Sequence, residues 1–464
     1  MVDHDARVRL LNQAAASVES DYVIYWAQAN RRLDSNHAFS FAAHLANEQA
    51  LPLLVYEALT CSHPWANDRF HTFILEGVPE NAKRAAQLGA GYVFYHRARR
   101  SGANDVLYKL ARKAYAVVTD DFPSYIPAVF NPGVASHIEV PYYVVDASCI
   151  IPMAAIGKQQ YAAYALRPKI QKLLPQFLAP VPSVKLVKRW SGDISAFHTE
   201  VTPETVQELV AQSDIDHTVP PAEIFRGGRS EAKKRLKQFL EHNLARYARH
   251  SREPSSKATS QLSPYLHFGC ISSLEIALAV REYAAEHKVI AEEFLEQLIV
   301  RRELAFNFAR YGPYPQKISS LPDWAQATLR KHAKDRRDPL YTREQFDSAS
   351  THDELWNACQ QELLRDGVIH GYYRMYWGKK IIEWSPTPQD ALDTMIYLND
   401  RYALDGRDPN TYTNILWCLG LHDRPWTERA IFGMVRYMSL DGMKRKTDVD
   451  AYLRENGTGQ SRLF

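Results

Sequence analysis

The pattern of apolar and polar positions divides the chain into two halves with different secondary structure. In the first half, short apolar runs predict strands at residues 22–26, 51–56, 91–95, 116–119 and 141–146. Helical periodicity lies between several of these runs and predicts helices at residues 37–49, 68–88 and 105–115. Strands that alternate with helices are typical of βαβ units, so we expect an α/β domain built on a Rossmann-like parallel sheet.

The second half has the spacing of helices throughout. Apolar residues recur on one stripe within residues 230–247, and further helices are expected at 272–286, 291–311, 353–366, 375–383 and 389–400. The stretch between the halves is rich in proline and weakly periodic, which favours a long connection. We therefore expect an α/β domain at 1–175, an interdomain linker at 176–221 and an all-helical domain at 222–464. The helical domain is large enough to enclose a cofactor cavity.

Composition and charge narrow the class of protein. The 464 residues are 46% hydrophobic and 23% charged, which is the balance of a soluble globular protein. The longest apolar stretches have the length of strands, so no membrane span is expected. A net charge of +3 neither requires nor excludes a nucleic-acid partner. The five cysteines are scattered without zinc-site spacing, which predicts no metal and a reducing, cytoplasmic location.

Carboxylates follow two of the predicted strands. Asp120 and Asp121 come directly after one strand and Asp146 ends another. Open α/β sheets bind ligands beyond the carboxyl ends of their strands, so these residues are candidate ligand contacts. Carboxylates in such loops also commonly cap turns, and the sequence leaves both interpretations open.

Two features of the second half are also open to two interpretations. The hydroxyl-rich stretch at residues 259–263 suits a phosphate group, and Ser263 before a proline would equally suit a plain helix N-cap. Trp377 and Trp384 are seven residues apart and therefore share one helix face. Large aromatic residues with that spacing are usually part of the core.

Three longer segments carry a resemblance to a known family. They read QLSPYLHFG at 261–269, HGYYRMYW at 370–377 and LNDRYALDGRDPN at 398–410. They resemble the FAD-binding domain of the class II cyclobutane pyrimidine dimer photolyases, which belong to the cryptochrome/photolyase family. The similarity continues through residues 351–357, 421–426 and 436–439, and includes the shorter segments 161–163 and 167–169 of the first half. A match over thirteen residues with fixed glycine, proline and charged positions is far more specific than a lone glycine motif.

The resemblance implies light-driven repair of cyclobutane pyrimidine dimers in DNA. In this family a U-shaped FAD lies in the helical domain, and its excited, fully reduced form donates an electron to a dimer that has flipped out of the duplex. The cyclobutane ring then splits and the electron returns. The expected partner is UV-damaged DNA, bound by a monomer that associates with the nucleoid. Residues 26–32 only loosely resemble the family's first-strand motif, which leaves a second, antenna chromophore open.

The resemblance also assigns residues to the FAD site. Asn399 matches the asparagine that faces flavin N5, and Arg374 and Asp405 match an ion pair over the isoalloxazine ring. Such a pair can tune the charge state of the flavin. The residues that match the phosphate-binding turn, together with the tyrosine beside it, are Thr259, Ser260, Leu262, Ser263 and Tyr247.

Further matches concern electron transfer and the lesion. Trp377, Trp356 and Trp384 match tryptophans that relay electrons from the surface to the flavin. Met375 and Trp417 match residues that line the dimer pocket, where the indole would stack on the flipped bases. Arg301 and Gln297, on the predicted helix 291–311, are also expected to contact the substrate.

The chain departs from the family pattern near the expected lesion pocket. Gln297 replaces a glutamate that touches the dimer, and an amide can hydrogen-bond a thymine carbonyl but cannot supply a proton. Phe306 stands where an aspartate usually precedes Asn307, and the segment 417–422 is one residue short. These differences keep two alternatives open: repair of another UV lesion of the six-four type, and a cryptochrome-like photosensor without repair activity.

Overall fold

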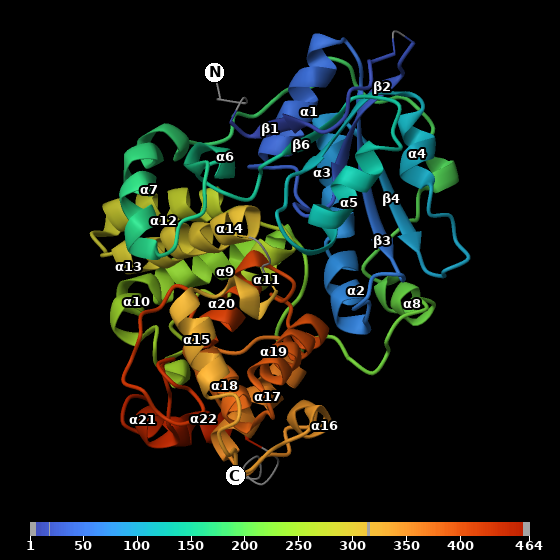
Figure 1. Cartoon of the computed structure of the whole chain (residues 1–464). Coiled ribbons are helices and arrows are strands. Elements are labelled where there is room, and N and C mark those ends of the chain that lie inside the picture. Colours follow the sequence, from blue (N-terminus) through green and yellow to red (C-terminus); the bar gives the residue numbers. More distant parts are fainter. Residues whose placement is uncertain (1–5, 18, 313–315, 458–464) are drawn as a thin grey trace.

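The first third of the chain forms a six-stranded sheet with the strand order β1-β6-β5-β2-β3-β4 in the computed structural model (Figure 1). The structure describes residues 6–17, 19–312 and 316–457. Each neighbouring pair in this sheet is parallel except β1 with β6, which is antiparallel. The strands are β1 (Val8–Leu10), β2 (Tyr22–Ala27), β3 (Leu53–Thr60), β4 (Gly91–Arg97), β5 (Ala114–Asp120) and β6 (Tyr142–Val145). The predicted Rossmann-like parallel sheet is therefore confirmed, with one short antiparallel edge strand that the apolar pattern did not predict.

Helices cover both faces of the sheet because successive side chains in a strand point to opposite sides. Tyr25 packs on the face covered by α1 (His37–Glu48), α3 (Val78–Leu88) and α8 (Val206–Ala211). Ile24 packs on the opposite face, beneath α4 (Val106–Ala111) and α5 (Tyr125–Ala135). Both faces are buried, which explains why the strands read as continuous apolar runs.

Two expected helices of this part differ from the structure. The stretch 68–88 forms two helices, α2 (Asp68–Leu75) and α3, because Pro79 lies in the first turn of α3 and starts a new helix. The expected helix 105–115 ends early, at Ala111, where α4 ends. Ala114 and Tyr115 instead belong to β5, and parallel pairing of Ala114 with Tyr22 outweighs the local helical pattern.

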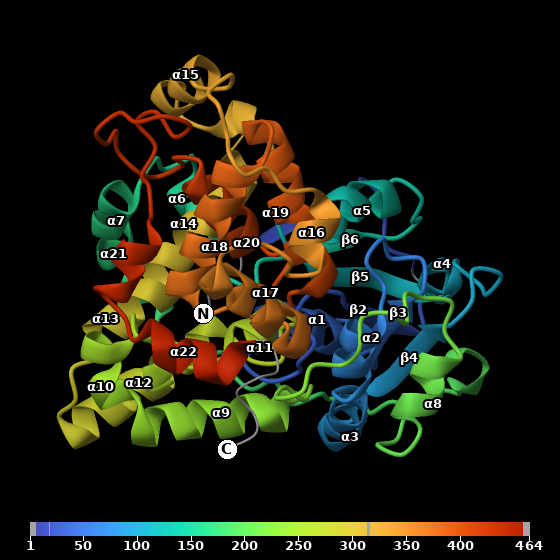
Figure 2. The same cartoon turned by 90° about the horizontal axis from the view of Figure 1, so that it is seen from below.

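From Arg229 onward the chain is mainly helical and lies beside the sheet (Figures 1 and 2). Its apolar residues form two large clusters, one of which also includes side chains of α7 and α2. The short helices are α6 (Met153–Ile156), α11 (Ser263–His267), α13 (Glu292–Leu295), α16 (Arg343–Asp347), α21 (Leu440–Lys444), η1 (Ser195–Phe197), η2 (Pro254–Ser256) and η4 (Ile318–Ser320). The longer ones are α7 (Ala163–Phe177), α9 (Arg229–His242), α10 (Leu244–His250), α12 (Ser273–His287), α14 (Arg302–Tyr311), α15 (Asp323–Lys331), α17 (Glu354–Asp366), α18 (Gly371–Trp384), α19 (Pro388–Tyr402), α20 (Pro409–Cys418) and α22 (Val449–Asn456). Among the described residues, no helix is long and apolar enough to span a lipid bilayer.

Two expected helices of this half are interrupted. The stretch 230–247 breaks at Asn243, between α9 and α10. The stretch 291–311 runs through α13, a π-helical segment η3 (Glu296–Arg301) and α14. The wider turn of a π-helix shifts the side chains that follow it, and such segments are frequent at functional sites. Gln297 lies in this segment.

The carboxylates at the strand ends support loops. Asp120 is fully buried and accepts hydrogen bonds from the three successive amides of residues 28–30. Asp146 accepts three amides from the loop that follows it, and Asp121 pairs with Arg310 at 2.6 Å. Asp120 and Asp146 therefore cap backbone amides, whereas Asp121 forms ion pairs with Arg9 and Arg310. The oxygens of all three are occupied by the protein itself.

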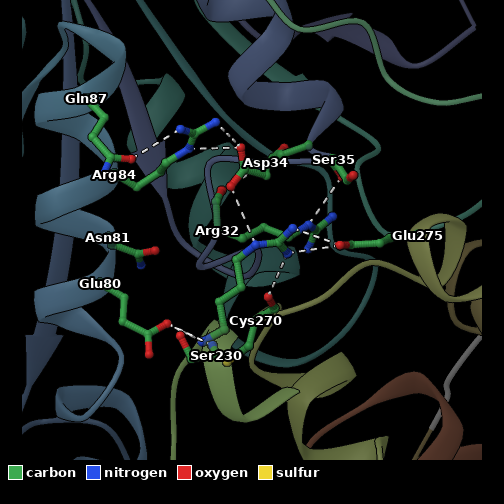
Figure 3. Close-up of polar contacts among 12 residues, drawn as sticks. Arg32, Asp34, Ser35, Glu80, Asn81, Arg84, Gln87, Ser230, Cys270 and Glu275 are labelled. Atoms are coloured by element: carbon green, nitrogen blue, oxygen red, sulfur yellow. Dashed lines mark hydrogen bonds and ion pairs between the residues drawn. The ribbon is translucent and has the colours of Figure 1, made fainter. Parts of the chain in front are cut away.

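A polar cluster joins the sheet to the helical half (Figure 3). The Arg229 guanidinium donates to both carboxylate oxygens of Glu275, at 2.9 and 2.8 Å, and lies 3.5 Å from Asp34. Glu80, on α3, accepts the amides of Arg229 and Ser230 in the first turn of α9. A carboxylate from one half thus caps a helix of the other, which fixes α9 relative to the sheet.

Candidate active site

A cavity of about 500 Å³ lies within the helical half. Its walls come from α10, α11, η3, α17, α18, α20 and α22. Figure 2 shows α17, α18, α20 and α22 in one region of the molecule. The cavity brings together eight of the predicted binding residues: Tyr247, Thr259, Ser260, Leu262, Ser263, Gln297, Arg374 and Asp405. They come from separate stretches of the sequence between residues 247 and 405, and the fold places them around a single space.

The hydroxyl-rich turn forms one wall of this cavity. Thr259, Ser260 and Ser263 all belong to its lining. Helix α11 begins at Ser263, Leu262 occupies the cap position, and no side chain caps the helix. The interpretation of Ser263 as a plain N-cap is therefore wrong. Hydroxyl groups beside a cavity, without a capping role, suit a phosphate or pyrophosphate group.

An ion pair forms part of another wall of this cavity. Arg374, on α18, donates from Nη2 to both carboxylate oxygens of Asp405, at 2.9 and 3.1 Å. The two side chains are only 11% and 12% exposed, so the pair lies in a poorly solvated place. Nε of Arg374 has no hydrogen-bond partner within the described structure. The guanidinium therefore has a donor left for a group bound in the cavity.

Asn399, on α19, lies close to Gly406, the residue that follows Asp405. Its Nδ2 donates to the carbonyl of Met395 at 2.9 Å, whereas Oδ1 is buried without a hydrogen-bond partner among the described residues. A Cβ at Gly406 would lie 2.5 Å from the Asn399 carbonyl, so glycine is required for this close approach of Asp405 to α19. Asn399 does not belong to the cavity lining that the structure describes. The structure thus places it next to the wall, with an unsatisfied acceptor.

The three predicted relay tryptophans form one series of rings. The indoles of Trp356 and Trp377 are stacked, with centroids 6.2 Å apart and 4° between their planes. Trp384 meets Trp356 at 6.3 Å in an edge-on arrangement. Trp384 is only 3% exposed, which corrects the expectation that the series begins at the surface. Tyr341 and His352 cover it, with ring centroids 5.6 and 4.9 Å away.

Three predicted substrate residues lie outside the described lining of the cavity. Trp417 is half-buried in the last turn of α20, and Met375 packs against the same apolar cluster from α18. Arg301 is half-exposed at the end of the π-helical segment, where its Nε lies 3.5 Å from Glu296. Of the predicted substrate residues, Gln297 is therefore the one that faces the cavity directly.

Phe306 has a structural role in the domain interface. It is fully buried and its ring meets Phe122 edge-on at 5.5 Å. Phe122 belongs to the loop after β5, so this contact lies between the sheet and α14. The departure at this position replaces a charge with an apolar contact between the halves, away from the cavity lining.

The cavity contains residues that the sequence patterns missed. Glu362 accepts hydrogen bonds from the hydroxyl of Tyr452 and the amide of His370. Burial raises the pKa of Glu362 to about 7 and lowers the pKa of His370 to about 4. At neutral pH the cavity therefore has an uncharged imidazole and a carboxyl group that readily holds a proton. His370 begins the segment HGYYRMYW at 370–377, whereas Tyr452 and Asn456, on the last helix, have no signal in the sequence.

A second cavity of about 240 Å³ lies at the carboxyl ends of β2 and β3. Its lining is rich in rings, among them Trp26, Phe130 and Phe268, and it includes buried polar atoms without a partner in the described structure, on Gln28 and His71. Burial lowers the pKa of His71 to about 3, so its imidazole is neutral. The lining also includes Arg31 and Arg407. This space suits a flat aromatic molecule.

The two cavities share part of one wall. His267, on α11, contributes to the lining of both. Its Nδ1 lies 3.3 Å from a carboxylate oxygen of Asp408, which also lines the larger cavity. A molecule in the second cavity would therefore lie close to a molecule in the first.

The larger cavity fits an FAD on its own chemistry. Nε of Arg374, in the lining, and Oδ1 of Asn399, next to the lining, are buried polar atoms without a hydrogen-bond partner among the described residues. Such atoms are costly unless a ligand satisfies them. Together with the hydroxyl-rich turn they offer hydrogen bonds to a polar heterocycle at one place and to phosphates at another.

Comparisons with known proteins give a consistent result. Residues 23–185 match the family model described as DNA photolyase. The deoxyribodipyrimidine photo-lyase of Methanothermobacter thermautotrophicus is 41% identical, with 97% of this chain and 98% of that protein covered. The deoxyribodipyrimidine photo-lyase of Potorous tridactylus is 36% identical, with 97% and 84% covered. Matches to a (6-4)DNA photolyase of Oryza sativa and to Cryptochrome-2 of Arabidopsis thaliana cover only 18% and 21% of this chain.

A solved structure shares the fold. The archaeal photolyase from Sulfolobus tokodaii, described with two FAD molecules, superposes with a TM-score of 0.67. The superposition covers 95% of this chain and 91% of that protein, and the two sequences are 16% identical.

Proposed function

This chain belongs to the DNA photolyase family, and on that premise we propose that it repairs cyclobutane pyrimidine dimers in DNA with the energy of light. Its close likeness over almost the whole length to proteins named deoxyribodipyrimidine photo-lyase supports this activity. The structural observation that most directly supports this activity is the cavity in which the hydroxyl-rich turn, the Arg374–Asp405 ion pair and Gln297 meet. The enzyme is a deoxyribodipyrimidine photolyase, a carbon–carbon lyase.

Bound FAD supplies the light absorption and the transferable electron, which no side chain of the protein can supply. We propose that Thr259, Ser260 and Ser263 bind its phosphates, because their hydroxyls line the cavity without capping α11. Arg374 and Asp405 would hold the ring system, since their charges are fixed in a poorly solvated place. Asn399 would offer its unpartnered Oδ1 to the edge of the ring. The reduced state of the cofactor in the active enzyme is part of this proposal.

The buried tryptophans give electrons a route across the helical half. Indole rings can lose and regain an electron, and those of Trp377, Trp356 and Trp384 succeed one another at 6.2 and 6.3 Å. Trp377 lies one helical turn after Arg374, which lines the cavity. We propose that this series prepares the enzyme for repair by reducing its cofactor.

Gln297 and Trp417 would act on the lesion itself. The Gln297 amide faces the cavity and can donate a hydrogen bond to a thymine carbonyl. Trp417 is half-buried, so part of its indole is free to stack on bases that leave the duplex. Met375 and Arg301 would flank them. A dimer distorts the duplex and pairs poorly, which makes it the least costly site to flip out.

We propose a second, light-harvesting chromophore in the smaller cavity. The photolyase of Sulfolobus tokodaii is described with a second FAD and a light-harvesting role for it. The smaller cavity here is lined by aromatic rings, holds a neutral His71 and shares His267 with the larger one. Absorption and excitation spectra of the purified protein test this, because energy transfer from a second chromophore adds a band to the excitation spectrum of repair. The monomeric state and the cytoplasmic, nucleoid-associated location stay predictions.

Light-dependent repair by matched variants tests the proposed function. The FAD-loaded, reduced protein should convert a thymine dimer in a defined oligonucleotide to two thymines under blue light. Asn399→Ala should impair cofactor reduction or repair, and Trp417→Ala should weaken dimer binding while FAD stays bound. Trp190→Phe, in the chain segment beside the sheet, is the control that should repair normally. Equal repair by all three variants would contradict the assigned site.

A further inference from the structure

Lys379 is a completely buried lysine that does not line either cavity. It lies on α18 and is 0% exposed. Its Nζ donates to the carbonyl of Cys418 at 2.6 Å, and the described structure gives it no ion pair with a carboxylate. A buried ammonium without a carboxylate partner costs free energy, and an apolar residue of similar size would avoid that cost. Its presence therefore calls for a specific function.

The ammonium lies at the end of α20. The last carbonyls of a helix have no partner within the helix, and Cys418 is the residue at which α20 ends. Gly378, the residue before Lys379 on α18, makes the contact between Lys379 and Cys418 possible. A Cβ at Gly378 would lie 2.8 Å from the Cys418 Sγ, so glycine allows α18 and α20 to approach here. Lys379 then reaches the carbonyl, where a cation also interacts favourably with the helix dipole.

The same ammonium lies beside Trp417. Its Nζ is 5.4 Å from the centre of the indole, within the range of a cation–π interaction. Arg436 also approaches this ring, at 5.2 Å, but it lies 4.3 Å from Trp426 and 3.3 Å from Asp423 as well. Within the described structure, the Lys379 ammonium has the Cys418 carbonyl as its hydrogen-bond acceptor and the Trp417 indole as its cation–π partner. It thus ties the ring of Trp417 to the end of its own helix.

We propose that Lys379 is a positioning residue that holds the Trp417 indole in the orientation required for stacking on the flipped-out dimer. This inference rests on the proposed function, in which Trp417 binds the lesion. The ammonium acts in two ways: it fixes the carbonyl next to Trp417, and it attracts one part of the ring. The free part of the indole then meets the bases already oriented, so less conformational entropy is lost when the lesion binds.

The charge of Lys379 depends on pH in a useful range. Burial lowers its pKa to about 8; the nearby Cys418 and Asp423 favour the charged form, whereas Arg436 opposes it. Below this pH the side chain is an ammonium, and above it the side chain is a neutral amine that no longer attracts the ring. The affinity for the dimer should therefore fall as the pH rises through about 8.

Binding measured in the dark tests the inference. The FAD-loaded protein is titrated with a fluorescent duplex that contains one thymine dimer, and with the undamaged duplex, from pH 6.5 to 9.5. The ratio of the two affinities removes general effects of charge on DNA binding. For the wild type we expect this ratio to fall about fivefold, the size expected for one cation–π contact. For Lys379→Met this ratio should be about fivefold lower than for the wild type at pH 7, and it should not change with pH.

Two further variants make the result decisive. Lys380→Met removes the neighbouring lysine, which pairs with Glu383 at 2.6 Å, and should keep the wild-type profile. Lys379→Arg keeps a charge above pH 8, so its affinity ratio should not change with pH. This variant tests the inference even if Lys379→Met does not bind FAD. A Lys379→Met or Lys379→Arg profile that still declines like the wild type would overturn the inference. A wild type that never prefers the dimer would instead contradict the proposed function.

Discussion

The indoles of Trp356 and Trp377 are stacked in the core of the helical half, with 4° between their planes and 6.2 Å between their centroids. Trp356 also donates from Nε1 to the carbonyl of Trp377 at 3.0 Å, which fixes the two rings relative to each other. Two helices, α17 and α18, therefore bring together residues that are 21 positions apart in the sequence. Parallel overlap of this kind favours electron transfer between the rings.

The first prediction concerns this ring pair. Trp377→Phe should abolish reduction of the bound flavin by light in the presence of an external thiol, because the series loses the ring nearest the cavity. Repair by protein that has first been reduced chemically should persist. Absorption spectra under blue light follow the reduction, and Trp190→Phe is the matched control. Normal photoreduction of Trp377→Phe would show that electrons take another route.

The second prediction concerns the Arg374–Asp405 ion pair. Asp405→Asn should leave the nearly buried guanidinium without its counter-charge, and breaking such a pair is strongly destabilising. We expect the free energy of unfolding to fall by about 3 kcal/mol. FAD should also be released faster, because the guanidinium in the cavity wall is no longer held in place. Flavin fluorescence during dilution measures the release of FAD. Asp338→Asn removes the partner of an exposed pair with Arg336 and should release FAD at the wild-type rate.

The third prediction concerns Gln297, which faces the cavity from the π-helical segment. Gln297→Leu removes the amide and should weaken dimer binding about tenfold, the cost of one unmade hydrogen bond to a buried carbonyl. Gln297→Glu should bind and repair the dimer at least as well as the wild type, because a glutamate can also supply a proton. Gel-shift titration and repair yield distinguish the two effects. An unchanged affinity for Gln297→Leu would mean that this side chain does not touch the lesion.

The fourth prediction concerns the pH dependence of stability. Glu303 is buried and accepts the amides of Ile150 and Ile151, at 2.7 and 3.0 Å, from the chain after the sheet. Burial raises its pKa from the usual 4.5 to about 7. Between these values the folded protein holds a proton that the unfolded chain has lost, so the free energy of unfolding falls as the pH rises. The loss approaches about 3 kcal/mol once the pH exceeds the folded-state pKa.

Glu303→Gln isolates this contribution because an amide does not titrate. The difference in unfolding free energy between the wild type and the variant should shrink or reverse from pH 5 to pH 8. Chemical denaturation at several pH values measures it. A difference that does not change with pH would show that Glu303 is ionised throughout this range.

The sequence predicts much of the fold because the local patterns and the tertiary structure agree. Buried strands such as β2 read as continuous apolar runs, and the helical half has regular apolar stripes. The predicted elements are wrong where long-range contacts determine the secondary structure. The pairing of Ala114 with Tyr22 extends β5 into an expected helix, and the π-helical turn around Gln297 has no local signature.

The candidate site could be predicted only where specific motifs carry it. Residues such as Arg374 and Asp405 lie in segments with a recognisable order of glycine, proline and charge. Tyr452 reaches the same cavity from the last helix, where an ordinary amphipathic pattern gives no sign of it. Likewise, nothing in the sequence shows that Trp384 is covered by Tyr341, because that contact depends on how two distant segments pack.

The lesion that the reduced, FAD-loaded protein repairs decides whether it is a cyclobutane dimer photolyase. One duplex carries a cyclobutane thymine dimer and a second carries a six-four photoproduct, and each is kept under blue light or in the dark. We expect light-dependent repair of the dimer alone, with no loss of either lesion in the dark. Repair of the six-four photoproduct alone would assign the enzyme to another lesion. No repair of either lesion would contradict the assignment as a repair enzyme and favour a photosensor.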